Sequence, residues 1–298
     1  MEKIQSSAEG FHILPQIEYI SGGETLYDFC LWEYKPLATC RNKFSAATLL
    51  FNSFEATGSD QRFYDLVHLI REGIGHSRTV WGTKLFGGKI KWEFYFYDYA
   101  RKARKASATT ILDVIKPVIN CSICVNEALE YFMFSLDITD ENVSGGRLLD
   151  EIHLYLGNPG STVSSGICYS LTGVGTRLEN FYFFFDAQRE VNEIIAKARS
   201  SAYIDSRINL DDILWPELRS CKIIVIANKQ QNDSVYFSGI DVNQLIFFLN
   251  RLNYPRGIVN FVERNNLSLD HLRYDVGFDY RMENGRLSIL KSGYYGVF

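Results

Sequence analysis

The sequence predicts an α+β fold in which about ten antiparallel strands, arranged as sequential hairpins, close into a β-barrel with helices outside. Three observations favour this fold. Short apolar runs recur in pairs from residue 78 onward, turn signals join the runs of each pair, and helical patterns separate several of the pairs. The runs also share an alternation: one face is aliphatic and aromatic, and the other is polar and rich in tyrosine.

Length and composition fit one large folded domain. The chain has 298 residues and is 46% hydrophobic, which is enough apolar material for a sizeable core. We expect a single domain over residues 1–298, with an irregular and helical N-terminal segment at 1–76 and a barrel of hairpins and helices at 77–298. The 21 Phe and 18 Tyr residues concentrate in the strand-like runs, so aromatic packing should dominate the sheet.

Charge and hydropathy argue against two classes of partner. The formal net charge of −4 and the pI near 5.8 do not suit a general nucleic-acid binder, which is normally basic. No run approaches the roughly 18 consecutive apolar residues of a membrane span. Residues 1–10 lack the apolar core of a signal peptide. The sequence therefore predicts a cytoplasmic protein that binds no nucleic acid and does not span a membrane.

The N-terminal segment predicts irregular structure followed by two helices. Residues 2–44 contain two prolines and several aromatic side chains, which suggests a segment that packs over another part of the molecule. Residues 45–74 fit two helices, the second ending at Gly73. The apolar residues of that second helix fall at helical spacing: Phe63, Leu66, Val67 and Ile70.

Three hairpins are expected in the middle of the chain. The first pairs residues 78–86 with 89–99 across Gly87-Gly88, a two-residue turn signal. A short helix at 110–118 follows it. The remaining elements are a second hairpin (130–139 with 150–157), a third (166–172 with 178–186), and a helix that Asp186 is expected to cap, with Val191, Ile194, Ile195 and Ala198 on its apolar side.

Two further hairpins and two helices complete the pattern. Residues 221–228 and 234–240 form the fourth hairpin, and a helix follows from Asp241, where the order Asp241-Val242-Asn243-Gln244 has the form of a capping box. A second helix is expected at 258–265. The fifth hairpin pairs 272–281 with 287–295 across Asn284-Gly285, because both central residues of a type I′ turn need positive φ.

The polar faces of the strands decide between an open sheet and a closed barrel. In residues 89–99, for example, Trp92 and Phe94 alternate with Glu93 and Tyr95. An open sheet with its polar face in solvent is one interpretation. A closed barrel explains the pattern better, because closure removes the exposed strand edges and encloses a lumen that shields the tyrosine rings from water. We therefore expect the polar faces of the long strands to meet in one interior.

Familiar catalytic and metal-binding motifs are absent from the sequence. The six cysteines include one C-x-x-C pair, Cys121 and Cys124, but no second pair at zinc-site spacing. The five histidines show no metal-ligand spacing, and there is no G-x-S-x-G, G-x-G-x-x-G or P-loop. The sequence therefore predicts no metal site.

The order of elements resembles the ABBA prenyltransferases, soluble enzymes with a ten-stranded barrel (the PT-barrel), helices outside and the active site within. Residues 78–298 are similar to both the bacterial aromatic and the cyanobactin-type peptide prenyltransferases. The resemblance rests on the hairpin order from Lys89 onward, on residues 234–238 running into the helix at Asp241, and on residues 287–295 with Tyr294-Tyr295.

The resemblance implies a transferase that moves an allylic isoprenoid from its diphosphate to a small aromatic or peptide acceptor. In such enzymes basic side chains hold the diphosphate, tyrosines shield the carbocation, and a carboxylate removes the acceptor's proton. Only some members use Mg²⁺, so the resemblance implies no certain cofactor. The matching candidates are Lys91, Arg273 and Lys291, expected to gather around one anion; Tyr95, Tyr155, Tyr182, Tyr236 and Tyr294 for the shield; and Glu93 for the base.

Alternative interpretations remain open for the same residues. An inward tyrosine can serve packing alone, and Glu93 can form an ion pair with Lys91 or Arg273. Two alternative functions are a barrel that binds a small ligand without catalysis, and a barrel enzyme of different chemistry with an acidic, tyrosine-rich lumen. The carboxylates that would make the lumen acidic are Asp137, Glu151, Asp275 and Asp279.

Overall fold

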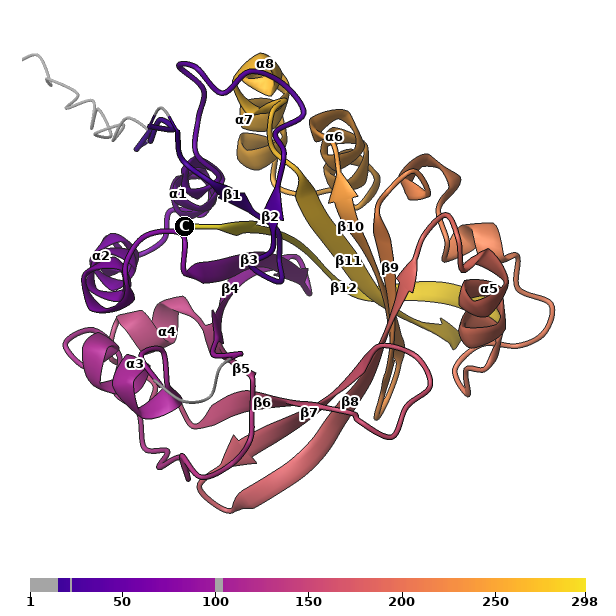
Figure 1. Ribbon diagram of the computed structural model, residues 1–298, viewed down its shortest axis with the longest axis horizontal. Helices are drawn as coiled ribbons and strands as arrows, with labels where there is room; N and C mark the ends of the chain where they lie inside the picture. The colour runs from indigo at the N-terminus through magenta and orange to yellow at the C-terminus, as the bar shows by residue number, and fades with distance from the viewer. Residues whose placement is uncertain (1–15, 22, 100–103) are drawn as a thin grey trace, which may run out of the picture.

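Ten strands form one closed antiparallel barrel in the computed structural model, which describes residues 16–21, 23–99 and 104–298 (Figure 1). The strands follow one another around the barrel in chain order, and β12 pairs with β3 to close it. Their bounds are β3 Thr79–Phe86, β4 Lys89–Tyr97, β5 Met133–Ile138, β6 Glu151–Gly157, β7 Ser165–Thr172, β8 Gly175–Asp186, β9 Ile223–Lys229, β10 Asp233–Ile240, β11 Tyr274–Glu283 and β12 Arg286–Val297.

The predicted closed barrel of sequential hairpins is confirmed, and the open sheet is wrong. Each expected pair of runs forms a hairpin, and the two-residue turns have the backbone that their residues favour. Gly87 and Gly88 have φ values of 57° and 76°, and Asn284 and Gly285 have 52° and 76°. Closure leaves no free strand edge among these ten strands.

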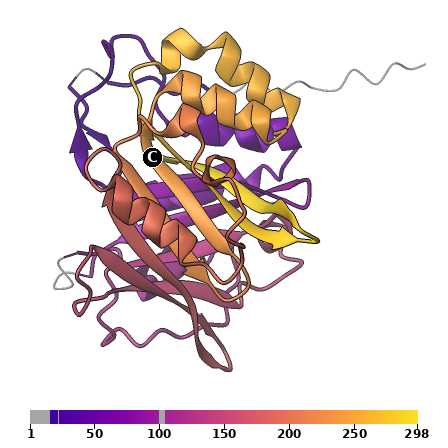
Figure 2. The same ribbon diagram turned by 90° about the vertical axis from the view of Figure 1, so that its right-hand side faces the viewer.

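Helices cover the outer face of the barrel wall (Figures 1 and 2). The α6 helix begins as predicted: the Asp241 carboxylate accepts the backbone N–H of Gln244 at 2.9 Å, and the Gln244 side chain accepts that of Asp241 at 3.0 Å. The bounds are α1 Ala47–Thr57, α2 Arg62–Ile74, α3 Ala108–Ile115, α4 Asp140–Val143, α5 Val191–Arg199, α6 Val242–Arg251, α7 Arg256–Arg264 and α8 Asn266–Leu269.

One predicted cap is wrong. The α5 helix has Glu190, not Asp186, at its N-cap position. The Asp186 carboxylate instead accepts the backbone N–H groups of Gln188 and Arg189, both at 3.0 Å, in the turn that follows β8. An aspartate side chain satisfies a turn and a helix start by the same kind of bond, so the sequence pattern did not separate the two positions.

The main core lies between the outer face of the strands and the helices. Trp92 shows how tightly the two layers pack: its ring is fully buried, and its centroid lies 4.5 Å from that of Phe63 in α2 and 5.1 Å from that of Phe54 in α1. The indole N–H donates to the Ser53 hydroxyl at 2.8 Å. A single side chain of β4 therefore joins both N-terminal helices to the barrel.

Trp92→Phe is expected to lower the free energy of unfolding by about 2 kcal/mol, because it opens a small cavity and leaves the buried Ser53 hydroxyl without its donor. Urea denaturation would measure the loss. Trp32, whose side chain is 57% exposed, provides the control, since Trp32→Phe should change stability by less than about 0.5 kcal/mol. Equal effects of the two changes would contradict this account of the core.

The N-terminal segment covers one end of the barrel. A small hairpin of β1 (Leu26–Tyr27) and β2 (Glu33–Tyr34) places Phe29 and Cys30 over that end. The Tyr97 hydroxyl donates to the Phe29 carbonyl, and the Tyr99 hydroxyl donates to that of Cys30 at 2.9 Å. Of the predicted segment 1–76, residues 1–15 and 22 lie outside the described residues.

Membrane-spanning helices were also sought. None of the helices in the described part of the chain is long and apolar enough to cross a bilayer.

Candidate functional site: the barrel lumen

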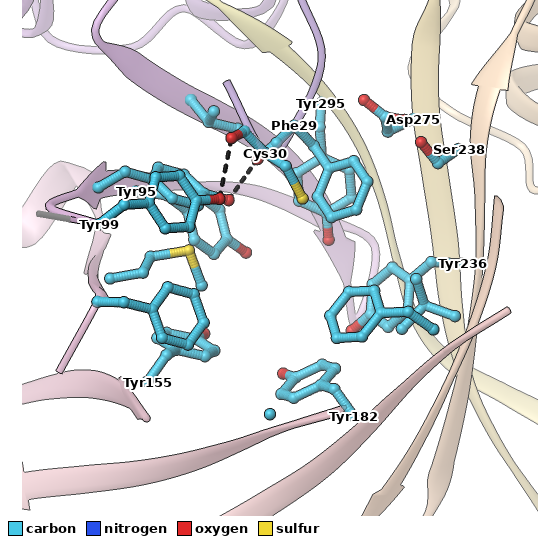
Figure 3. A pocket seen from close by; sticks show the side chains of 17 residues that line it. Phe29, Cys30, Tyr95, Tyr99, Tyr155, Tyr182, Tyr236, Ser238, Asp275 and Tyr295 are labelled. Atoms are coloured by element: carbon cyan, nitrogen blue, oxygen red, sulfur yellow. Dashed lines mark hydrogen bonds between the residues drawn. The ribbon is translucent and has the colours of Figure 1, made fainter. Parts of the chain in front are cut away.

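The lumen has two cavities that meet at a ring of tyrosines. The cavity under the N-terminal hairpin, here called the apolar end, has a volume of about 110 Å³. The cavity at the opposite side, the polar end, has about 680 Å³. Five side chains line both cavities and surround the hollow in Figure 3; we call them the tyrosine ring: Tyr95, Tyr155, Tyr182, Tyr236 and Tyr295.

The tyrosine ring is continuous around the lumen. The centroid distances between successive rings are 6.5, 5.9, 6.3, 6.3 and 6.0 Å. Glycines leave space for two of them: a Cβ atom on Gly277 would lie 2.2 Å from Tyr236, and one on Gly82 would lie 2.6 Å from Tyr295. Burial raises the pKa of Tyr95, Tyr155, Tyr182 and Tyr295 well above the usual value, so these phenols stay neutral.

Glu93 lies directly beside this ring, at the start of the polar end. The residue is 2% exposed, and its carboxylate accepts hydrogen bonds from the hydroxyls of Tyr95 and Ser135, each at 2.5 Å. The Lys84 ammonium forms an ion pair with the same carboxylate. The predicted ion pair with Lys91 or Arg273 is therefore replaced by one with Lys84, the cross-strand neighbour of Lys91 on β3.

Ion pairs organise the rest of the polar end. Lys84 Nζ also lies 3.1 Å from Asp137 Oδ1. Lys229 Nζ contacts both oxygens of Asp279, at 2.9 and 3.0 Å, and the Ser234 hydroxyl donates to Oδ1 of that carboxylate at 2.6 Å. The neighbouring lysines hold the pKa of Asp279 down at about 2, although burial opposes this. These carboxylates are therefore charged throughout the neutral pH range.

The polar end is balanced in charge. Burial lowers the pKa of His153, which favours its neutral form. The lumen is thus less acidic than one sequence-based alternative expected. Its charged lining residues are Lys84, Arg177, Lys229 and Lys291 against Glu93, Asp137, Glu179 and Asp279.

The three predicted diphosphate ligands do not come together. Lys91 and Lys291 line one groove at the rim of the polar end. The Lys91 ammonium lies 5.3 Å from the centre of the Phe86 ring, and Lys291 Nζ lies 3.8 Å from Asp279. Arg273 belongs to the opposite end, where its Nη1 donates to the Gly239 carbonyl at 3.1 Å. The barrel separates Arg273 from the lysines because it precedes β11, whereas Lys291 pairs with Asp279 farther along that strand.

Four of the five predicted shield tyrosines line the lumen, and Tyr294 does not. Tyr294 faces outward and is fully buried, with its ring 5.6 Å from Trp81 and 5.7 Å from Tyr254. Tyr295 takes the place in the ring. Lys291 and Tyr294 are three residues apart, so the two-residue period of a strand places them on opposite faces, and this signal was present in the sequence.

A possible metal-binding trio was missed by motif searching. Ligand atoms of Glu93, Asp137 and His153 all lie within 4.8 Å of one another. They come from β4, β5 and β6, so their separation in sequence matches no ligand motif. Lys84 contacts both carboxylates, so an ion could enter only if this ammonium moved.

Comparison with known proteins gives one distant relative to report. No family model matches the chain. A protein of Acanthamoeba polyphaga mimivirus, described as "putative JmjC domain-containing protein", is 23% identical over 311 residues, which cover 91% of this chain and 49% of that protein. The chain thus spans about half the length of this relative.

This match corrects the functional interpretation of the sequence. It points to a protein described by a JmjC domain and away from the ABBA prenyltransferases, so the assignment drawn from short segments is wrong, together with the prenyl transfer it implied. The isoprenoid diphosphate expected as a partner is unsupported, and the separation of Arg273 from Lys91 and Lys291 removes the predicted anion cluster. What the structure retains is the closed barrel with its enclosed, tyrosine-lined lumen.

Proposed function

We propose that the protein is a barrel enzyme that binds a small molecule in its lumen and transfers a proton there, with Glu93 as the general base. One observation carries this proposal: a buried carboxylate, held by three donors, faces a cavity of about 680 Å³ beside a ring of aromatic side chains. Residues 1–298 act in this proposal as one domain, in which segment 1–76 covers the barrel of residues 77–298.

The two ends of the lumen indicate the kind of substrate. The tyrosine ring offers flat, neutral surfaces that suit an aromatic or aliphatic body. The polar end offers ammonium groups, carboxylates and hydroxyls in nearly equal measure, which suits a hydroxyl-bearing group that both donates and accepts hydrogen bonds. We therefore infer a small amphipathic substrate with a hydroxylated polar group.

Glu93 has the surroundings of a positioned base. The Tyr95 and Ser135 hydroxyls hold its two oxygens in fixed directions, and the Lys84 ammonium stabilises its negative charge. Burial lowers the pKa of Lys84, so this ammonium releases a proton more readily than an exposed lysine does. Lys84 could thus return to the product the proton that Glu93 removes from the substrate.

A thermal-shift screen tests the substrate class. Hydroxylated aromatic compounds should raise the Tm, since a ligand that binds only the folded state adds about 2.7 kcal/mol of stability at 100 times its Kd. Benzoate and benzylamine, which carry a single charge, are the comparison compounds, and they should raise the Tm less. No stabilisation by any hydroxylated aromatic at millimolar concentration would argue against a substrate of this class.

The Glu93, Asp137 and His153 trio supports a second candidate, a reaction assisted by a divalent metal ion. Two carboxylates and one imidazole differ from the two-histidine, one-carboxylate set of non-haem iron oxygenases, and they suit Mn²⁺ or Mg²⁺ better. A bound ion would supply Lewis-acid polarisation of a substrate oxygen. In that case these three residues would hold the ion, and Glu93 would not be free to act as a base.

Metal titration distinguishes the two candidates. If the trio binds a metal, MnCl₂ should raise the Tm by several degrees, EDTA should reverse the shift, and Asp137→Asn should abolish it. Glu151→Gln is the control, because Glu151 neighbours His153 but does not belong to the trio. A Tm that is unchanged by millimolar Mn²⁺ or Mg²⁺ rules out the metal-assisted reaction and leaves Glu93 as a free carboxylate.

A further inference from the structure

A second carboxylate lies in the lumen, at the end away from Glu93. Asp275 of β11 is 7% exposed and lines the apolar end, where Figure 3 shows it beside Ser238. The Gly239 backbone N–H donates to its Oδ1 at 3.1 Å, and the Ser238 hydroxyl and the Phe29 N–H also bond to the carboxyl group. All three donors are neutral.

The Asp275 carboxylate has no cationic partner. No Lys, Arg or His nitrogen of the residues that the structure describes forms an ion pair with it, for which the limit is 4.0 Å. Burial raises the pKa of Asp275 to about 7, and the nearby Asp28 carboxylate adds to this. The charged and titratable groups of the surrounding elements are Asp28, Cys30 and Tyr34 of the N-terminal hairpin, Tyr97 of β4, Lys222 before β9, and Arg273 before β11.

Aromatic rings form most of the remaining wall. Of the seventeen residues that line the apolar end, ten are Phe or Tyr. The faces of such rings carry partial negative charge and attract organic cations when water is excluded. The lining offers a metal ion few oxygen ligands, and an anion would be repelled by Asp275. A cage of rings with one carboxylate is the arrangement that suits a cation with apolar substituents.

We propose that the apolar end of the lumen binds an alkylammonium ion, with Asp275 as its counter-ion and the surrounding rings against its methyl or methylene groups. The site does not depend on Glu93 or on the chemistry of the polar end. The ligand reaches it through the lumen, because the tyrosine ring borders both cavities. The ammonium could be a free small molecule or the amine of a larger substrate that also occupies the polar end.

Calorimetric titration with choline and with its uncharged isostere 3,3-dimethylbutan-1-ol tests the proposal. The two molecules have nearly the same shape, so their difference in affinity reports the positive charge. We expect choline to bind the wild-type protein at least tenfold more tightly at pH 8. Since only the ionised carboxylate attracts the cation, choline affinity should also rise about tenfold from pH 6 to pH 8.

Variants identify the residue responsible. Asp275→Asn should reduce choline affinity to that of the uncharged alcohol, whereas Asp279→Asn, on the same strand at the polar end, should leave choline affinity unchanged. Equal affinity of the wild type for both compounds, no choline binding at 10 mM, or full choline preference in Asp275→Asn would overturn the proposal. The wild-type comparison needs no mutation, so it decides the matter even if Asp275→Asn does not fold.

Discussion

Glu93→Gln is expected to lower turnover by roughly 10²- to 10⁴-fold while ligand-induced stabilisation remains nearly unchanged. Glutamine keeps the shape of the side chain and its contacts with Tyr95 and Ser135, but it cannot accept a proton from the substrate. The measurement is turnover of a substrate identified by the thermal-shift screen, made on the same preparation as the Tm.

Asp137→Asn is the matched comparison for Glu93→Gln. Asp137 also pairs with Lys84 in the polar end but lies farther from the tyrosine ring, so its change should lower turnover much less. A Glu93→Gln protein that melts at the wild-type temperature and retains full activity would remove Glu93 from the mechanism. A large loss of stability with a proportional loss of activity would instead assign Glu93 a purely structural role.

Lys84→Met should lower the free energy of unfolding at pH 7 by about 3–5 kcal/mol. The reason is the position of Glu93, a carboxylate that is 2% exposed and has Lys84 as its counter-ion. Removing the ammonium leaves a buried charge that only two hydroxyls stabilise. Urea denaturation of both proteins would measure the difference.

The double variant Lys84→Met/Glu93→Gln separates charge from packing. It removes the buried carboxylate together with its partner, so most of the lost stability should return. Lys291→Met is the control, because the Lys291 side chain is 32% exposed and lies 3.8 Å from Asp279, an arrangement worth at most about 1 kcal/mol. A double variant that is no more stable than Lys84→Met would show that the ion pair is not what stabilises this part of the lumen.

Asp275 should make stability depend on pH in the opposite sense to most carboxylates. Its pKa is raised from 3.8 to about 7, so the folded state holds a proton that the unfolded state loses, and stability falls as pH rises through this interval. Between pH 5.5 and pH 8, the wild type should lose about 2 kcal/mol more than Asp275→Asn does. Urea denaturation of both proteins at the two pH values would measure this, and parallel losses would contradict a raised pKa.

The alternation of residues made most of the fold predictable. The inward and outward faces of β4 follow from the order of Glu93, Phe94 and Tyr95 alone, since side chains alternate along a strand. Gly87-Gly88 and Asn284-Gly285 fixed two of the turns, because their backbone requirements are local. Helix α6 was located by its capping box for the same reason.

The partner of Glu93 is Lys84 and not Lys91, a choice that depends on how far each residue lies along the barrel axis. Asp275 carries no local signal of its isolation, which results from the N-terminal hairpin that covers its end of the lumen. The resemblance to prenyltransferases rested on the order of elements, and a fold hosts many chemistries.

The crystal structure of a complex tests the central claim, that the lumen is the binding site, most directly. Crystals would be grown with the hydroxylated aromatic compound that raises the Tm most. We expect its ring to lie within the tyrosine ring and its hydroxyl group to lie within hydrogen-bond distance of Glu93 or Lys84. A compound bound on the outer surface of the barrel, with only water in the lumen, would contradict the claim.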